Sequence, residues 1–207
     1  LTTSSAASDV YKRQKKWFKR YEKHLPNTGE IVFFDRSWYT RALVEATMGY
    51  CTKRQYTYFM KNVIPWEKKQ IEEGVEFFKF YLSIEKNTQQ KRIDKRATSP
   101  LVYWKISEND LKMLDKWDAF TLYKEQMFKR TSYDEAPWIV LNANNKKVAI
   151  LSALRFILNA FDYPDKDLPK PKIWSEGLNN YKVEINKVLF ENLSYQQYKT
   201  LRVFADE

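Results

Sequence analysis

Short apolar runs alternate with longer amphipathic stretches along most of the chain, an order that predicts strands separated by helices. Three continuous apolar runs have the length of strands buried on both faces, at 31–34, 77–84 and 138–141. The segments between these runs are predicted to be helices, because their apolar residues have helical spacing or because they are charged with little Gly or Pro. They lie at 15–25, 39–47, 55–74, 87–97, 107–130 and 146–161. Strands joined by helices of this length predict an α/β fold, with a parallel sheet and helices on both faces.

Turn and cap residues set the limits of several of these elements. Gly74 stands where a C-cap glycine ends a helix, and Ser107 with Asp110 has the spacing of a capping box at the start of the long helix. After Pro164, a stretch rich in Asp, Lys and Pro predicts a linker, and one helix is expected near 182–191. The extension 164–207 would cover the sheet edge, mediate oligomerisation or stay loose, and the pattern leaves these three roles open.

The first 14 residues are small, polar and unpatterned, and they run abruptly into the basic, aromatic KKWFKRYEKHL. We interpret 1–14 as a leader foreign to the protein and exclude it from the fold. The main domain is then expected to cover 15–163 and to lack its native start.

Composition narrows the class of protein. With 207 residues, 43% of them hydrophobic and 30% charged, the chain can form one sizeable domain with a core. No apolar run approaches the roughly 18 residues that span a bilayer, and no secretory signal is visible. A single cysteine, Cys51, and a single histidine, His24, exclude a disulfide framework, a histidine-rich metal centre and a Ser-His-Asp triad. We therefore predict a reducing, cytoplasmic location.

The positive charge lies in one part of the chain. Thirty-six Lys and Arg against 26 Asp and Glu give a formal charge of +10, yet 164–207 holds seven of each sign. The whole excess therefore lies in 1–163, where it favours a polyanionic partner: nucleic acid, anionic lipid or a phosphate-rich substrate. Solvated lysines with no ligand are the alternative.

Two groups of residues are candidates for chemistry. Asp35 and Arg36 follow the apolar run 31–34, where an open α/β sheet places its ligands, and such a pair can organise Mg²⁺ and contact phosphate oxygens. The alternative for Asp35 is a helix N-cap. Arg92 and Arg96 are four residues apart, so on a helix they share one face and can neutralise phosphates from a mobile lid. The alternative for these arginines is a solvated helix.

Four ordered motifs carry a family resemblance. The stretches GEIVFFDRSWYTRALVEATMGYCT, RIDKRATSPLVYWKISENDL, KWDAFTLYKEQMF and APWIVLNANNKK resemble the polyphosphate kinase 2 family, in its branch with the sequence Asp-Arg-Ser-Trp-Tyr. The resemblance implies a P-loop kinase-like fold with a helical lid at about 86–112. It also implies phosphoryl transfer between inorganic polyphosphate and a nucleotide (ADP, GDP or AMP), with Mg²⁺ as cofactor, in a homo-oligomer.

The resemblance also assigns residues to roles. Asp35 matches the Walker B aspartate, which makes it the metal residue, and Arg36 matches its phosphate-contacting neighbour. The remaining matches are two polar positions on the following helix and four lid positions: Arg41, Glu45, Arg92, Arg96, Lys105 and Asp110. Asp35, Arg36, Arg92 and Arg96 are the expected catalytic residues, and the others are expected to bind substrate. Trp38 is the one aromatic residue that we expect near a ligand.

One family element has no match. The Walker A loop, roughly Gly-x-Asp-x-x-Gly-Lys, should precede this region, but the four glycines at 29, 49, 74 and 177 form no such loop. We therefore expect this chain to be an inactive fragment of a polyphosphate-dependent kinase. Two alternatives stay open: another P-loop nucleoside or nucleotide kinase, and a basic nucleic-acid-binding module. No RNP motif, zinc finger or continuous basic helix supports the nucleic-acid-binding module, so we expect no nucleic acid partner. We expect no membrane partner either.

Overall fold

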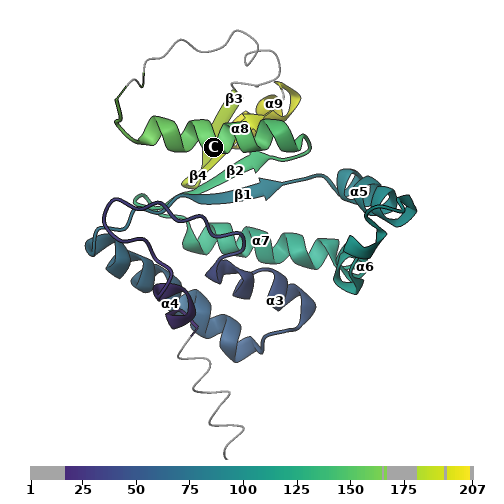
Figure 1. Ribbon diagram of the computed structural model, residues 1–207, viewed down its shortest axis with the longest axis horizontal. Coiled ribbons are helices and arrows are strands. Elements are labelled where there is room, and N and C mark those ends of the chain that lie inside the picture. Colours follow the sequence, from purple (N-terminus) through teal and green to yellow (C-terminus); the bar gives the residue numbers. More distant parts are fainter. Residues whose placement is uncertain (1–16, 165, 167–180, 194, 206–207) are drawn as a thin grey trace, which may run out of the picture. The chain divides into compact units, whose positions relative to one another are not determined.

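A computed structural model describes residues 17–164, 166, 181–193 and 195–205 (Figure 1). The chain forms two compact units. Unit 1 combines the residues up to Phe77 with Lys116–Thr131, and unit 2 combines Phe78–Asp115 with Ser132–Glu207.

Unit 1 is helical. Its elements are α2 (Lys19–Glu22), the 3-10 helix η1 (Trp38–Arg41), α3 (Val44–Met48), α4 (Lys53–Glu72) and α7 (Trp117–Thr131). The longest helix, α4, begins at a capping box in which the backbone N–H of Gln55 donates to Thr52 Oγ1 at 3.2 Å and the Thr52 N–H donates to Gln55 Oε1 at 2.7 Å. It ends just before Gly74, whose φ of 94° is the left-handed conformation that glycine adopts without a steric cost. The predicted helix at 55–74 is confirmed.

Aromatic side chains form the core of unit 1. The Phe18 ring stacks on Phe59 and Trp66, with centroids 5.6 and 4.9 Å away. The Trp66 ring in turn meets Trp38 edge to face at 4.8 Å. Offset and edge-to-face pairs of this kind each stabilise a core by roughly 0.5–1.5 kcal/mol beyond the burial of their area.

Unit 2 contains a four-stranded sheet in the order β1-β2-β4-β3. The strands are β1 (Lys79–Ser83), β2 (Trp138–Asn142), β3 (Tyr181–Ile185) and β4 (Val188–Leu193). β2 pairs parallel with both β1 and β4, and β3 pairs antiparallel with β4. The flanking helices are α5 (Lys86–Thr98), η2 (Tyr103–Lys105), α6 (Glu108–Asp115), α8 (Lys146–Ala160) and α9 (Tyr195–Ala205). The α/β class and the parallel pairing of the runs at 77–84 and 138–141 are confirmed.

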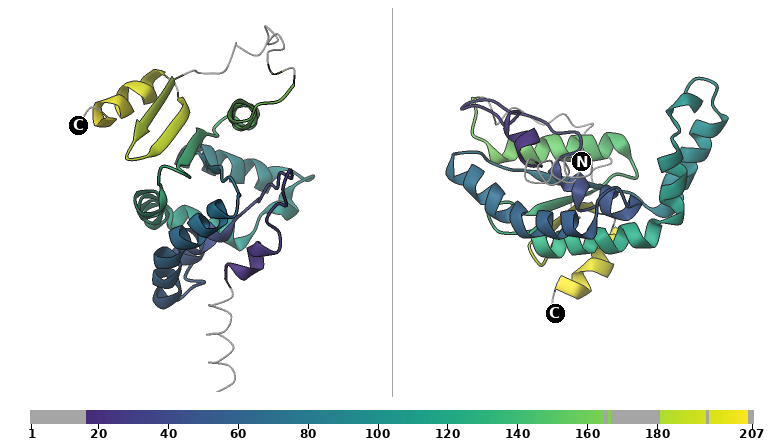
Figure 2. Two further views of the ribbon diagram at one scale, coloured as in Figure 1. Left: turned by 90° about the vertical axis from the view of Figure 1, so that its left-hand side faces the viewer. Right: turned by 90° about the horizontal axis from the view of Figure 1, so that it is seen from below.

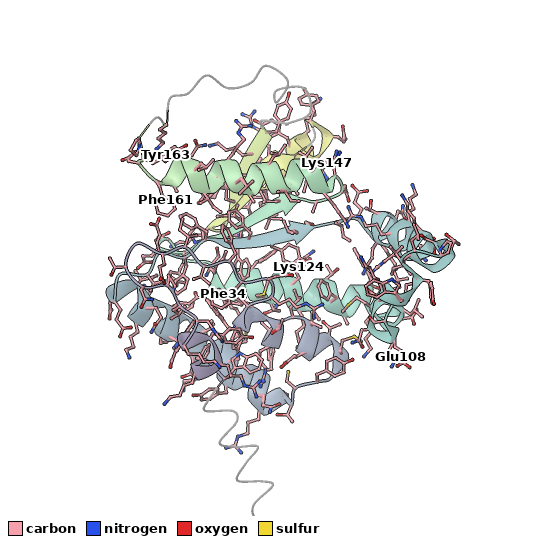
Figure 3. All side chains as sticks on the ribbon, viewed as in Figure 1. Phe34, Glu108, Lys124, Lys147, Phe161 and Tyr163 are labelled. Carbon is pink, nitrogen blue, oxygen red and sulfur yellow. The ribbon has the colours of Figure 1, made fainter. Side chains whose placement is uncertain are left out.

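Helix α8 packs on this sheet through aromatic rings. Phe156 lies edge to face with Phe78 and Phe80 of the β1 region, at 6.1 and 5.7 Å. Figure 3 labels Lys147 and Phe161 at opposite ends of the helix, and Phe161 also contacts Phe78, at 5.6 Å. The C-terminal half of α8 therefore packs against the β1 region of the sheet.

The prediction of a buried strand at 31–34 is wrong. Residues 31–34 form no strand, and Ile31 and Phe33 are 64% and 71% exposed. A strand exists only where a neighbour accepts its backbone hydrogen bonds, and no strand in the described part of the chain pairs with this segment. An apolar run predicts the tendency to form a strand but not the partner.

Two further predictions are wrong. The long helix at 107–130 is interrupted at Lys116, so that α6 ends in unit 2 and α7 begins in unit 1. The helix expected near 182–191 is instead the hairpin β3–β4, because Asn186 and Lys187 adopt φ of 50° and 62°, the conformation of the type I′ turns that close two-residue hairpins. β4 lies beside β2, so this part of the extension adds strands to the sheet. The predicted leader 1–14 and most of the linker lie outside the described residues.

Candidate active site

The Asp35-Arg36 pair is exposed and sits on a strained backbone. Both side chains are exposed, and Asp35 has no hydrogen-bond or ion-pair partner among the described residues. Arg36 has a φ of 70°, a left-handed conformation that disfavours side chains with a Cβ atom and costs about 1 kcal/mol or more. The alternative of Asp35 as an N-cap is wrong, because Ser37 caps η1 by accepting the Tyr39 N–H at 3.3 Å.

Buried aromatic side chains hold this exposed pair in place. Trp38 is 3% exposed, and its Nε1–H donates to Glu67 Oε1 on α4 at 2.9 Å. Trp17 Nε1–H donates to the Trp38 carbonyl, and Tyr21 Oη–H donates to the Ser37 carbonyl, both at 3.2 Å. The Trp38 ring is enclosed in the core and so offers no exposed face to a ligand. Its role is to fix the chain directly after Arg36.

Arg41 and Glu45 form a pair on consecutive helical turns. Arg41 Nε lies 2.5 Å from Glu45 Oε2, and the Arg41 guanidinium stacks over the Trp17 ring at 3.8 Å. Arg41 is 9% exposed, so most of its charge is already satisfied within unit 1. This geometry suits support of the Asp35 segment better than direct contact with a free phosphate chain.

The lid positions lie on α5, η2 and α6 of unit 2, and α5 and α6 form an arm beyond the carboxyl end of β1 (Figure 2). Arg96 Nη2 lies 3.5 Å from Asp110 Oδ1. Ser107 donates to Asp110 Oδ2 from both its backbone N–H and its hydroxyl, at 3.0 Å each, and accepts the Asp110 N–H, which confirms the capping box. Partial burial raises the pKa of Asp110, but the Ser107 hydrogen bonds and then the Arg96 charge outweigh it and lower the pKa.

The other lid residues differ in how far they are available to a ligand. Arg92 is half-buried, and its Nη2 donates to the carbonyls of Ala143 and Asn144 at 2.7 and 2.9 Å. Lys105 is exposed, and its ammonium lies 5.1 Å from the ring centre of Trp104, itself 68% exposed.

The structure thus places the predicted residues in two groups. Asp35, Arg36, Arg41 and Glu45 belong to unit 1, and the four lid residues belong to unit 2. Among the described residues, no cluster of three or more His, Cys, Asp or Glu side chains can hold a metal. Mg²⁺ commonly takes one or two carboxylates together with phosphate oxygens and waters, so the unpaired carboxylate of Asp35 fits such an ion.

Two site residues escaped prediction. Glu67 sits in a charged stretch of α4 that is typical of a solvated helix, yet it is fully buried against Trp38. Asn144 belongs to a polar loop, yet it contacts Glu85 and Arg92, 59 and 52 positions away in sequence. Neither contact has a local signal in the sequence.

Comparisons with known proteins agree on one family. The family model described as Polyphosphate kinase 2 matches residues 3–169. The chain is 43% identical over 166 residues to Polyphosphate kinase PPK2B of Corynebacterium glutamicum, over 78% of this chain and 54% of that protein. It is 45% identical over 155 residues to GDP-polyphosphate phosphotransferase of Pseudomonas aeruginosa, over 74% of this chain and 43% of that protein.

A solved structure gives the same result. Polyphosphate Kinase 2 from Arthrobacter aurescens TC1 superposes with a TM-score of 0.64 and 30% identity, over 74% of this chain and 56% of that one. The chain spans about half the length of the curated relatives that it matches. The strands β3 and β4 and the helix α9 lie beyond the residues that the family model matches. No helix in the described ranges is both long and apolar enough to cross a membrane.

Proposed function

Because this chain belongs to the polyphosphate kinase 2 family, we propose that the protein transfers a phosphoryl group between inorganic polyphosphate and a nucleotide. The observation that carries this proposal is the exposed Asp35-Arg36 pair, held on strained backbone by the buried Trp38. A carboxylate and a guanidinium fixed side by side in solvent offer one group for a metal and one for phosphate oxygens.

Acidic and basic residues would have different roles in the reaction. The expected Mg²⁺ would supply positive charge that offsets the negative charge of the phosphates. The Asp35 carboxylate would hold that ion or its waters. Arg36 would contact phosphate oxygens through its planar fork of donors, and Arg96, on the lid in unit 2, would contact phosphates through the same chemistry.

The identity of the acceptor is a second part of the proposal. Relatives at 40–45% identity carry the names GDP-, NDP- and ADP-polyphosphate phosphotransferase. These names support a nucleoside diphosphate as the acceptor of this protein. The net charge of +10 suits a polyanionic donor. A homo-oligomer belongs to the same proposal and rests on the family resemblance, and a cytoplasmic location rests on the single cysteine.

The test supplies different phosphate donors to the whole protein that contains this chain. We expect nucleoside triphosphate to form from long-chain polyphosphate and a nucleoside diphosphate in the presence of Mg²⁺, with no other phosphate donor. Another nucleoside kinase would need a nucleoside triphosphate as donor, and a nucleic-acid-binding module would form no product with either donor. Either of those two outcomes would refute the proposed function.

A further inference from the structure

A cluster of polar contacts that the proposed function does not use lies in unit 2, where α5 begins beside the loop 142–145. The Glu85 backbone N–H donates to Asn144 Oδ1 at 3.0 Å, and Asn144 Nδ2–H donates to Glu85 Oε1 at 2.9 Å. One amide side chain therefore satisfies both a donor and an acceptor of the residue that precedes α5.

The same loop holds α5 at a second point. Arg92 lies seven residues after Glu85, so both side chains are on one face of the helix, about two turns apart. The Nη2 group of Arg92 donates to the carbonyls of Ala143 and Asn144 at 2.7 and 2.9 Å. Two attachments on one face fix the direction of a helix as well as its position.

The loop that receives these contacts is itself fixed to the sheet. The Ala143 N–H donates to the Ser83 carbonyl at the end of β1 at 2.7 Å. The Asn144 N–H donates to Asn142 Oδ1 at 3.1 Å, and Asn145 caps α8 by accepting the Lys147 and Val148 N–H groups. The loop is therefore a rigid base for α5 at the carboxyl ends of β1 and β2.

From this geometry we propose that Asn144 and Arg92 are positioning residues, which clamp the root of the lid to the sheet, and that Arg96 presents its guanidinium to the phosphates. The assignment to phosphates rests on the proposed function. Arg92 already donates its Nη2 hydrogens to two backbone carbonyls. Arg96 lies one turn further along α5. Its Nε–H donates to the Arg92 carbonyl at 3.3 Å, and in the described part of the chain its Nη2 has only the long 3.5 Å contact with Asp110, which a phosphate can replace.

A substitution cycle on the chain as it stands tests the clamp. Asn144→Asp places a second carboxylate against Glu85 and removes a donor, so hydrogen–deuterium exchange of the α5 amides should speed up about tenfold. Glu85→Gln alone should change little, because the amide oxygen of glutamine still accepts from Asn144. The double variant Glu85→Gln/Asn144→Asp restores the pair with donor and acceptor exchanged, and it should return exchange to within about twofold of the parent.

The control is Asn87→Asp, which adds the same charge to the exposed first turn of α5 at a side chain with no hydrogen bond to the loop 142–145 among the described residues. It should not speed up the exchange of the α5 amides, because a negative charge in the first turn of a helix is favourable. Faster exchange throughout unit 2 in Asn144→Asp, or no rescue in the double variant, would overturn the clamp.

Polyphosphate affinity, measured on the same variants, tests the link to function. Arg96→Ala should weaken binding about tenfold or more and leave exchange in the first two turns of α5 unchanged, whereas Arg92→Ala should speed that exchange. Weaker binding in Arg92→Ala with unchanged exchange would overturn the assignment of Arg92. A parent chain that binds no polyphosphate would count against the proposed function, while the exchange data would still decide the clamp.

Discussion

The buried indole of Trp38 should be the main support of the exposed Asp35-Arg36 pair, and Trp38→Phe tests this without adding a polar group to the core. The substitution removes the Nε1–H that donates to Glu67 Oε1 at 2.9 Å, where Glu67 is fully buried. Leaving a buried acceptor short of one donor costs about 2 kcal/mol, and the smaller ring adds about 1 kcal/mol for lost packing. The expected loss of stability is therefore about 3 kcal/mol, or about 6–12 °C in Tm for a chain of this size.

Far-UV circular dichroism during urea and thermal denaturation measures this loss without depending on tryptophan fluorescence. The matched control is Trp104→Phe, the same substitution at a ring that is 68% exposed and donates only to a neighbouring carbonyl. It should change the free energy of unfolding by less than about 0.5 kcal/mol. A loss below about 1 kcal/mol in Trp38→Phe, or an equal loss in the control, would refute the reasoning.

Three further predictions follow from other contacts. Burial raises the pKa of Tyr81 from 10.0 to about 12, so folding favours its neutral form. The free energy of unfolding should therefore be intact below pH 10 and fall as the pH rises toward 12. Urea denaturation across that range should show less of this loss in Tyr81→Phe. Asn145→Ala removes the cap of α8 and should cost about 1 kcal/mol in the same assay; an unchanged midpoint would show that the cap is not needed. Arg96→Lys keeps the charge but loses the planar fork, so polyphosphate binding should weaken while its salt dependence stays close to that of the parent in titrations at two salt concentrations. An unchanged affinity would return this helix to an ordinary solvated surface.

The sequence was sufficient where local patterns determine the structure. The Ser107–Asp110 capping box, the helix α8 with its apolar stripe and the parallel pair β1–β2 follow from periodicity and cap chemistry. The prediction of a strand at 31–34 was wrong because a strand depends on a partner strand. The prediction of a helix near 182–191 was wrong because the turn of the hairpin β3–β4 outweighed a weak helical pattern. Tertiary pairing therefore decided the first error, and local turn geometry decided the second.

The site shows the same division. The sequence showed that Asp35 and the lid arginines are charged, but it did not show which of these side chains is free to contact a ligand. Arg92 donates to carbonyls 51 and 52 positions away, whereas Arg96, four residues later, has a weaker hold. No local signal separates two arginines on one helix face, because the difference lies in a loop on another part of the chain.

The most direct test of the account is polyphosphate-dependent phosphoryl transfer by the whole protein that contains this chain, compared with its Asp35→Asn variant. The side chain of Asp35 is exposed and has no partner among the described residues, so the variant should keep the Tm and circular dichroism of the parent. Losing a placed charge in phosphoryl transfer should lower the rate of nucleoside triphosphate formation by about 10²-fold or more. A rate within about twofold of the parent would contradict the role of Asp35 and the proposed site.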